Sequence, residues 1–212
     1  MKKLLAMDID IGLSRIKRRI NGSKRVLALD LETLVKDRFL SNEDIVAISI
    51  GTLQGEYEVL LADPSDYNEY DLLKKLDEII DSYQPEVIIG YNHVSYDITL
   101  INTKIVSLSY SKQLFALKYF FGTSYLMDMM YSCALYGRRI TGDYKVTSLK
   151  NVVRSEMFSS LNLMRVKEIV SIPDMNPAQA VEYLWKNDPE SLRKYSKGDV
   201  HDLIEIYKFI FN

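Results

Sequence analysis

The sequence is poor in the features that mark secreted, zinc-binding and membrane proteins. It contains one cysteine, Cys133, in 212 residues, so the chain can form no internal disulfide and no cysteine-based zinc site. No apolar run approaches the roughly 20 residues that a membrane-spanning helix needs, and the opening residues MKKLLAMDID become acidic too soon for a signal peptide. We therefore expect a cytoplasmic protein in a reducing compartment, with no membrane association.

Neither sign of charge is in clear excess. The 27 Lys and Arg residues nearly balance the 29 Asp and Glu residues, which gives a net charge of −2, whereas a protein that coats nucleic acid is expected to be strongly basic. Local basic patches occur at the cluster SRIKRRINGSKR, residues 14–25, and at Arg138-Arg139. Each patch has two interpretations, contact with a nucleic-acid backbone or an ordinary solvated face, and the sequence leaves both open.

Length and composition predict one folded domain preceded by a short basic segment. With 47 % hydrophobic residues, a chain of 212 residues can bury a substantial core. Asn21-Gly22 marks a break before the first core strand. We therefore divide the chain into a basic N-terminal segment, residues 1–24, and a domain of residues 25–212.

Hydrophobic periodicities change along the chain in an order typical of an α/β domain. The strand-like runs predict a three-stranded antiparallel meander at residues 25–33, 44–52 and 55–63. A helix at residues 69–84 and a short buried strand at 86–92 follow it. Residues 122–145 are too mixed to assign. Further helices are expected at residues 97–107, 147–157, 177–187 and 189–211.

The first strand, RVLALDLET at residues 25–33, carries two acids one residue apart. Side chains alternate along a strand, so Asp30 and Glu32 share one face with Val26 and Ala28, and the leucines occupy the other face. Two buried carboxylates so close disfavour each other's ionised forms, so a positive charge is expected between them. The alternative is that the strand ends at residue 29 and both acids lie in a solvated loop.

A second acid follows the buried strand of residues 86–92. In the stretch GYNHVSYD, Asn92 and Asp97 lie in the loop and helix start at the carboxyl end of that strand, where open α/β sheets usually bind ligands. The ordinary structural alternative is that Asp97 is only the N-cap of the next helix.

A third acid lies on the long C-terminal helix, in KYSKGDVHDLIEIY. Tyr195 and Asp199 are four residues apart, so they share a helix face, and that face continues through the apolar Leu203 and Ile206. An acid on an apolar stripe is unfavourable, so we expect it to have a function. The alternative is a solvated aspartate beside a tyrosine that only packs.

Taken together, the three segments resemble the three motifs of DEDD-superfamily exonucleases, in particular the proofreading exonuclease domain of family-B DNA polymerases. ALDLETL is similar to the first motif, PEVIIGYNHVSYD to the second and YSKGDV to the third, and the likeness covers roughly residues 25–212. The histidine variant needs a histidine where this chain has Lys194, so the resemblance is to the tyrosine variant. It implies an RNase H-like α/β fold, with a mixed sheet of antiparallel and parallel strands flanked by helices.

The resemblance also implies an activity and a site. The expected reaction is metal-dependent 3′ to 5′ hydrolysis of DNA, at single-stranded or frayed ends, to nucleoside 5′-monophosphates, with two divalent cations, Mg²⁺ or Mn²⁺. Asp30 would bridge both metals, Glu32 and Asp199 would complete the metal on the nucleophile side, Asp97 would hold the second, and Tyr195 would orient the attacking water. Contacts with the terminal nucleotide are implied for Thr33, Leu34, Asn92 and Tyr96.

Two features leave the biological context open. The chain is too short for the palm, fingers and thumb of a polymerase, so we expect a stand-alone domain. No motif reports contact with a 2′ hydroxyl, so an exoribonuclease with the same site is one alternative. Another is a non-catalytic adaptor for a replication or repair partner, although all four acids are present.

Overall fold

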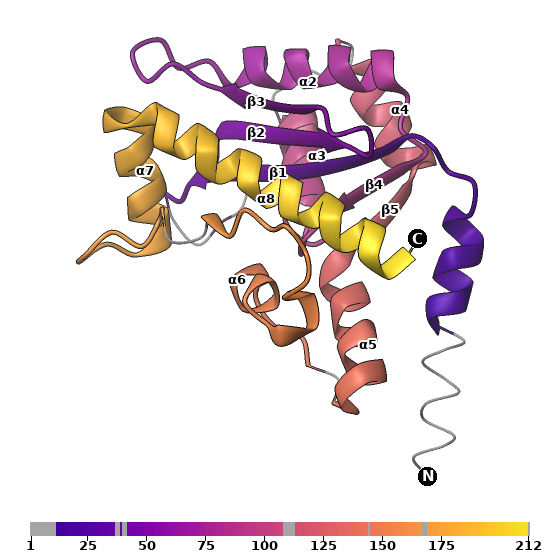
Figure 1. The fold of residues 1–212 in the computed structure, drawn as a ribbon. Helices are drawn as coiled ribbons and strands as arrows, with labels where there is room; N and C mark the ends of the chain where they lie inside the picture. Colours follow the sequence, from indigo (N-terminus) through magenta and orange to yellow (C-terminus); the bar gives the residue numbers. More distant parts are fainter. Residues whose placement is uncertain are drawn as a thin grey trace.

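A computed structural model describes residues 12–36, 39, 42–107, 113–143, 145–166 and 169–211 (Figure 1). Its centre is a five-stranded sheet with the order β3-β2-β1-β4-β5. The strands β1 (Val26–Leu34), β2 (Asp44–Thr52) and β3 (Tyr57–Leu61) form an antiparallel meander, whereas β4 (Val87–Gly90) pairs in parallel with β1 and β5 (Tyr125–Asp128) in parallel with β4. The expected mixed sheet is confirmed.

Most helices lie where their periodicity predicts. The described helices with labels are α2 (Glu69–Tyr83), α3 (Asp97–Ser107), α4 (Phe115–Thr123), α5 (Met129–Thr141), α6 (Leu149–Val153), α7 (Pro177–Asn187) and α8 (Pro189–Phe211). The helix expected at 147–157 is shorter, because Ser155 is extended (φ −69°, ψ 149°) and separates α6 from a 3₁₀ turn, Glu156–Phe158. None of these helices is long and apolar enough to cross a bilayer.

Residues 122–145, which the sequence left unassigned, contain the end of α4, all of β5 and all of α5. The strand β5 has only four residues, and of these only Met127 is buried. Such a short run gives no alternation to detect. The start of α5 is capped by Asp128, whose side chain accepts a hydrogen bond from the backbone N–H of Met130.

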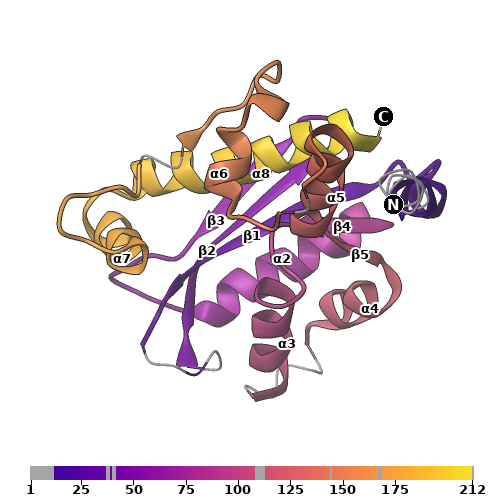
Figure 2. The same cartoon turned by 90° about the horizontal axis from the view of Figure 1, so that it is seen from below.

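Both faces of the sheet are covered by apolar side chains. On β1, Leu27, Leu29 and Leu31 face a cluster built with α2, α3, α4 and α7, while Val26 and Ala28 face a second cluster built with α5, α6 and α8. Figure 2 shows α2, α3 and α4 on one side of the strands and α5, α6 and α8 on the other. The alternation expected for β1 is therefore observed, and its acids share the face that α8 covers.

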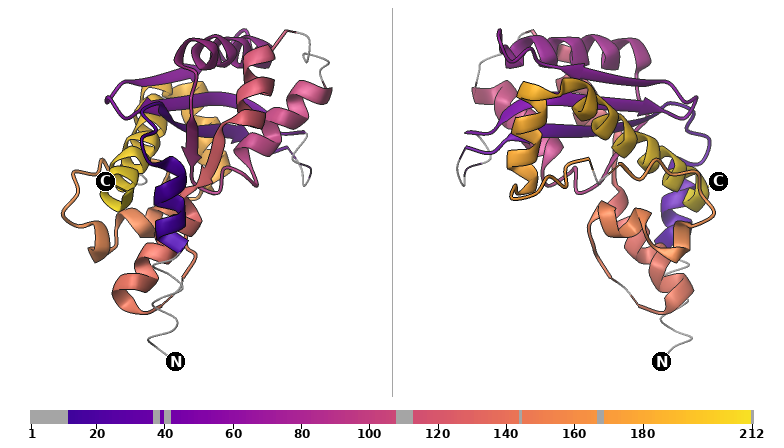
Figure 3. Two further views of the ribbon diagram at one scale, coloured as in Figure 1. Left: turned by 90° about the vertical axis from the view of Figure 1, so that its right-hand side faces the viewer. Right: turned by 60° about the vertical axis from the view of Figure 1, so that its left-hand side comes forward.

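The N-terminal segment contributes a helix at residues 12–20. Its Leu13 and Ile20 are buried in the cluster of α8, and Figure 3 shows this helix beside the C-terminal end of α8. The turn at Asn21-Gly22 requires glycine, because Gly22 has φ +84°. The division at residue 24 stays a prediction, and residues 1–11 lie outside the described part of the chain.

Candidate active site

The first and third sequence motifs bring three acids together between β1 and α8. One carboxylate oxygen from each of Asp30, Glu32 and Asp199 lies within 4.8 Å of the others. Glu32 and Asp199 are buried, at 8 % and 2 % exposure, and Asp30 is half-buried. No other group of three metal-ligating side chains lies so close in the described parts of the chain. The solvated alternatives for these acids do not apply.

The position of α8 depends on a close contact with the segment that precedes α7. A Cβ atom at Gly198 would lie 2.2 Å from Val166 Cγ2, so only glycine allows this approach. Asp202, one helical turn further, accepts hydrogen bonds from the backbone N–H groups of Met164 (2.7 Å) and Arg165 (3.1 Å). This strap, residues 164–166, therefore holds in place the part of α8 that carries Asp199.

Tyr195 lies next to the three acids on the same face of α8. It is 8 % exposed, and its hydroxyl group forms a hydrogen bond with Asp199. Burial, followed by the charges of Glu32, Asp199 and Asp30, raises the pKa of Tyr195. The phenol therefore stays protonated at neutral pH and remains a hydrogen-bond donor.

Asp97, the first residue of α3, adds a fourth acid to the site. It is 3 % exposed, and its pKa is raised well above the usual value, first by burial and then by the neighbouring charge of Asp30. Its carboxylate accepts a hydrogen bond from the backbone N–H of Leu31 in β1. Asp97 is therefore more than a local helix cap.

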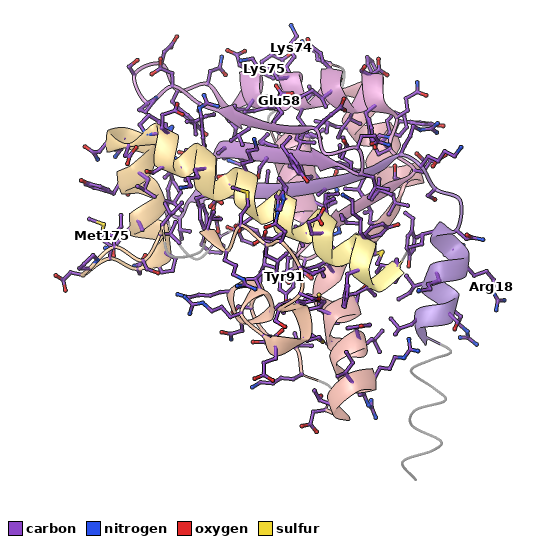
Figure 4. The ribbon with its side chains drawn as sticks, viewed as in Figure 1. Arg18, Glu58, Lys74, Lys75, Tyr91 and Met175 are labelled. Atoms are coloured by element: carbon purple, nitrogen blue, oxygen red, sulfur yellow. The ribbon has the colours of Figure 1, made fainter. Side chains whose placement is uncertain are left out.

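The loop between β4 and α3 turns sharply over the end of the sheet. Gly90 leaves room for the turn, because a Cβ atom there would lie 2.5 Å from the Cβ atom of His93. Burial lowers the pKa of His93 to about 4, so this side chain is neutral and packs inside the loop. Tyr91 lies below α8 in Figure 4, and its hydroxyl group donates to the carbonyl of Thr147.

Asn92 is held in the left-handed region, with φ 61°. Its backbone N–H donates to Asp128 Oδ1 at 2.9 Å, and its side chain is exposed and free to meet a ligand. Asp128 therefore supports both this loop and the start of α5, a role that the sequence analysis missed. An acid between a short apolar run and a helix was the available signal.

The remaining predicted contacts lie at the end of β1. Thr33 Oγ1 donates to Glu43 Oε2 at 2.7 Å and lies 2.9 Å from the hydroxyl oxygen of Tyr96, which also donates to Glu43. Leu34 is half-buried and packs against the cluster of α2 and α3. Glu43 was not predicted, because a single acid before an apolar strand has no distinguishing pattern.

Comparison with known families identifies the chain. Residues 10–132 match the family model for the exonuclease domain of DNA polymerase family B. The chain belongs to this family. The first two motifs lie inside the matched residues, and the third lies beyond them. Membership confirms the expected resemblance and the enzyme class, a 3′ to 5′ exonuclease.

The fold is similar to that of a solved family-B DNA polymerase from the hyperthermophilic archaeon Pyrobaculum calidifontis. The TM-score is 0.61 at 21 % sequence identity, and the match covers 87 % of this chain. It covers 24 % of the polymerase, so the chain spans about a quarter of that protein's length. The likeness confirms the RNase H-like fold. No curated protein matches the chain.

Proposed function

We propose that this exonuclease domain removes nucleotides from the 3′ ends of DNA, single-stranded or frayed, and releases nucleoside 5′-monophosphates. The observation that carries the proposal is the grouping of Asp30, Glu32 and Asp199 within 4.8 Å. Asp97 and Tyr195 interact electrostatically with the same group. Three grouped acids with a fourth acid and a protonated phenol beside them suit the hydrolysis of a phosphodiester.

The donor set fits hard divalent cations. All four candidate ligands are carboxylates, which Mg²⁺ and Mn²⁺ prefer, and mostly buried acids so close together need a compensating positive charge. If two such cations bind, Asp30 would hold both, Glu32 and Asp199 would hold one of them, and Asp97 would hold the other. Such cations, when bound, stabilise the attacking and leaving oxygens of an in-line displacement.

The remaining residues orient the reactants. The hydroxyl group of Tyr195 holds and directs the attacking water, a role that suits a phenol whose raised pKa keeps it protonated. Asn92, with its exposed side chain, and the end of β1 at Thr33 and Leu34 contact the terminal nucleotide, together with Tyr96. A terminal nucleotide must leave its base pair to reach these residues, and unpairing costs least at single-stranded or mismatched ends.

The deciding experiment is the digestion of 5′-labelled oligonucleotides with Mg²⁺ or Mn²⁺, using DNA and RNA in parallel and EDTA as the control. We expect a descending ladder on DNA that is faster on single strands and mismatched ends than on blunt duplexes. Cutting of a closed circular single strand would exclude an exonuclease. Preference for RNA would favour the exoribonuclease alternative, and an inert but folded protein would favour an adaptor.

The cellular setting is also a proposal. A cytoplasmic location is supported by the single, buried Cys133. A replication or repair protein that presents DNA ends is the proposed partner. Co-purification with such a protein from the native cytosol would test both statements.

A further inference from the structure

A buried carboxylate outside the three motifs connects two of them. Glu43 lies immediately before β2 and is 7 % exposed. Its Oε2 atom accepts hydrogen bonds from Thr33, in the first motif, and from Tyr96, in the second. The residues that should contact the terminal nucleotide therefore share one anchor.

No cation compensates this carboxylate within the described part of the chain. The nearby lysines are engaged elsewhere, Lys36 with Asp44 at 2.6 Å and Lys104 with Glu69 at 3.1 Å. The partners of this buried carboxylate among the described residues are hydroxyl groups, which compensate a charge less well than a cation does. What these contacts do is fix the side chains of Thr33 and Tyr96 relative to each other.

The hydrogen bonds of Tyr96 determine which part of its side chain is available to contact a substrate. The hydroxyls of Thr33 and Tyr96 carry two protons between them, and both are used among the three contacts with each other and with Glu43. Neither hydroxyl has a proton left for the nucleotide. The half-buried ring of Tyr96 is what remains for contact, and an aromatic ring stacks on any base, at about 1–3 kcal/mol per base.

We infer that Glu43 is a positioning residue for substrate, which holds the ring of Tyr96 against the end of β1 so that it stacks on the 3′-terminal base. The inference rests on the proposed function, because it assumes that a nucleic-acid end enters the site. It adds a residue that acts on substrate affinity through Tyr96 and does not touch the reacting phosphate.

The test compares Glu43→Leu, which removes the acceptor, with Glu43→Gln, which keeps one. Two substrates are used with Mg²⁺ or Mn²⁺: a single-stranded oligonucleotide, and bis(p-nitrophenyl) phosphate, which has no base to stack. Glu43→Leu should raise KM for the oligonucleotide about tenfold with little change in kcat, and Glu43→Gln should restore most of the affinity. Hydrolysis of the small substrate should be unchanged in both variants.

Tyr96→Phe is the second perturbation, and Tyr83→Phe is its matched control, since the Tyr83 hydroxyl donates to the carbonyl of Val26 at the other end of β1. Tyr96→Phe should raise KM and Tyr83→Phe should not. The double variant Glu43→Leu with Tyr96→Phe should be little worse than either single variant, because both changes remove the same contact.

Unchanged oligonucleotide KM in folded Glu43→Leu would overturn the inference, and so would an equal loss on both substrates. If Glu43→Leu does not fold, as judged by circular dichroism, Tyr96→Phe and Thr33→Val remove the same hydrogen bonds, and unchanged KM in both would also refute it. Failure of the proposed function differs from these results, because the unmodified protein would then hydrolyse neither substrate.

Discussion

In the absence of divalent cations, replacing Asp199 by asparagine should stabilise the folded protein. Asp199 faces Asp30 and Glu32 with carboxylate oxygens within 4.8 Å. At that separation, two full charges repel by roughly 3.5 kcal/mol with an effective dielectric constant of 20. Solvent screening at the half-buried Asp30 lowers this value, so we expect a gain of about 2 kcal/mol in the free energy of unfolding, or about 4–8 °C in Tm.

Metal should reverse the order of the melting temperatures of the unmodified protein and the Asp199→Asn variant. Ligand that binds only the folded state stabilises it by about 2.7 kcal/mol at a concentration of 100 times Kd. The unmodified protein should therefore melt at a higher temperature in Mg²⁺ or Mn²⁺ than in EDTA. Asp199→Asn lacks one of the proposed ligands, so its melting temperature should respond less to metal, and it should be inactive.

In the absence of metal, lowering the pH should stabilise the folded protein, as the Asp199→Asn substitution should. The pKa of Asp97 is raised well above 3.8 in the folded protein, so its neutral form is favoured by folding. Its contribution to stability is complete below about 3.8 and is lost as the pH rises through the folded pKa. In EDTA, the free energy of unfolding should therefore increase as the pH falls toward about 3.8, and Asp97→Asn should make it less dependent on pH.

Asp81→Asn is the control for the loss of one negative charge, because Asp81 is exposed on α2. Thermal melts in EDTA and in metal, followed by circular dichroism, measure all these effects. A lower or unchanged Tm for Asp199→Asn in EDTA would refute the argument that repulsion destabilises the site. An undiminished response of that variant to metal would remove Asp199 from the ligand set.

Three further predictions follow from the structure. Tyr195→Phe should lower turnover about 10- to 1,000-fold with little change in affinity, as measured by steady-state kinetics; an unchanged rate would mean that the tyrosine only packs. Gly198→Ala places a methyl group 2.2 Å from Val166 Cγ2 and should destabilise the fold by about 1–3 kcal/mol and reduce activity, as shown by melts and turnover. Arg15 and Arg18 are exposed on the helix of residues 12–20, and Arg18 points to solvent in Figure 4. The double variant Arg15→Glu with Arg18→Glu should bind long single strands more weakly, and its affinity should depend less on salt concentration. Equal affinity would mean that this helix is only a solvated face.

Sequence periodicity predicts the elements that bury a continuous stripe. The helix α8 has the bounds expected from its pattern, and α2 ends one residue earlier than expected, because Gln84 adopts the left-handed conformation (φ 52°) and caps it. Short elements escape such analysis. The four residues of β5 are recruited by pairing with β4, a long-range interaction that leaves no local period.

The acids of the site are easier to recognise in the sequence than the residues that hold them in position. Acids on an apolar face are costly without a function, which is why Asp30 and Asp199 stand out. Their positions, however, are fixed by contacts such as that of Asp202 with the strap of residues 164–166. Glu43 and Asp128 act in the same way, and each is a single acid whose partner lies on another element. The sequence offers no pattern for Glu43, and for Asp128 it offers only the ordinary one of an acid before a helix.

The placement of the acids on β1 explains how the fold tolerates them. This strand is central, hydrogen-bonded to β2 on one side and β4 on the other, and its residues Val26 to Leu29 are fully buried. Repulsion among the acids therefore acts on a strand that cannot move without disrupting both apolar clusters. Charges held in a rigid frame cannot separate to relieve their repulsion, so proton uptake and cation binding are the routes that relieve it. The same rigidity would keep the carboxylates in place for the proposed catalysis.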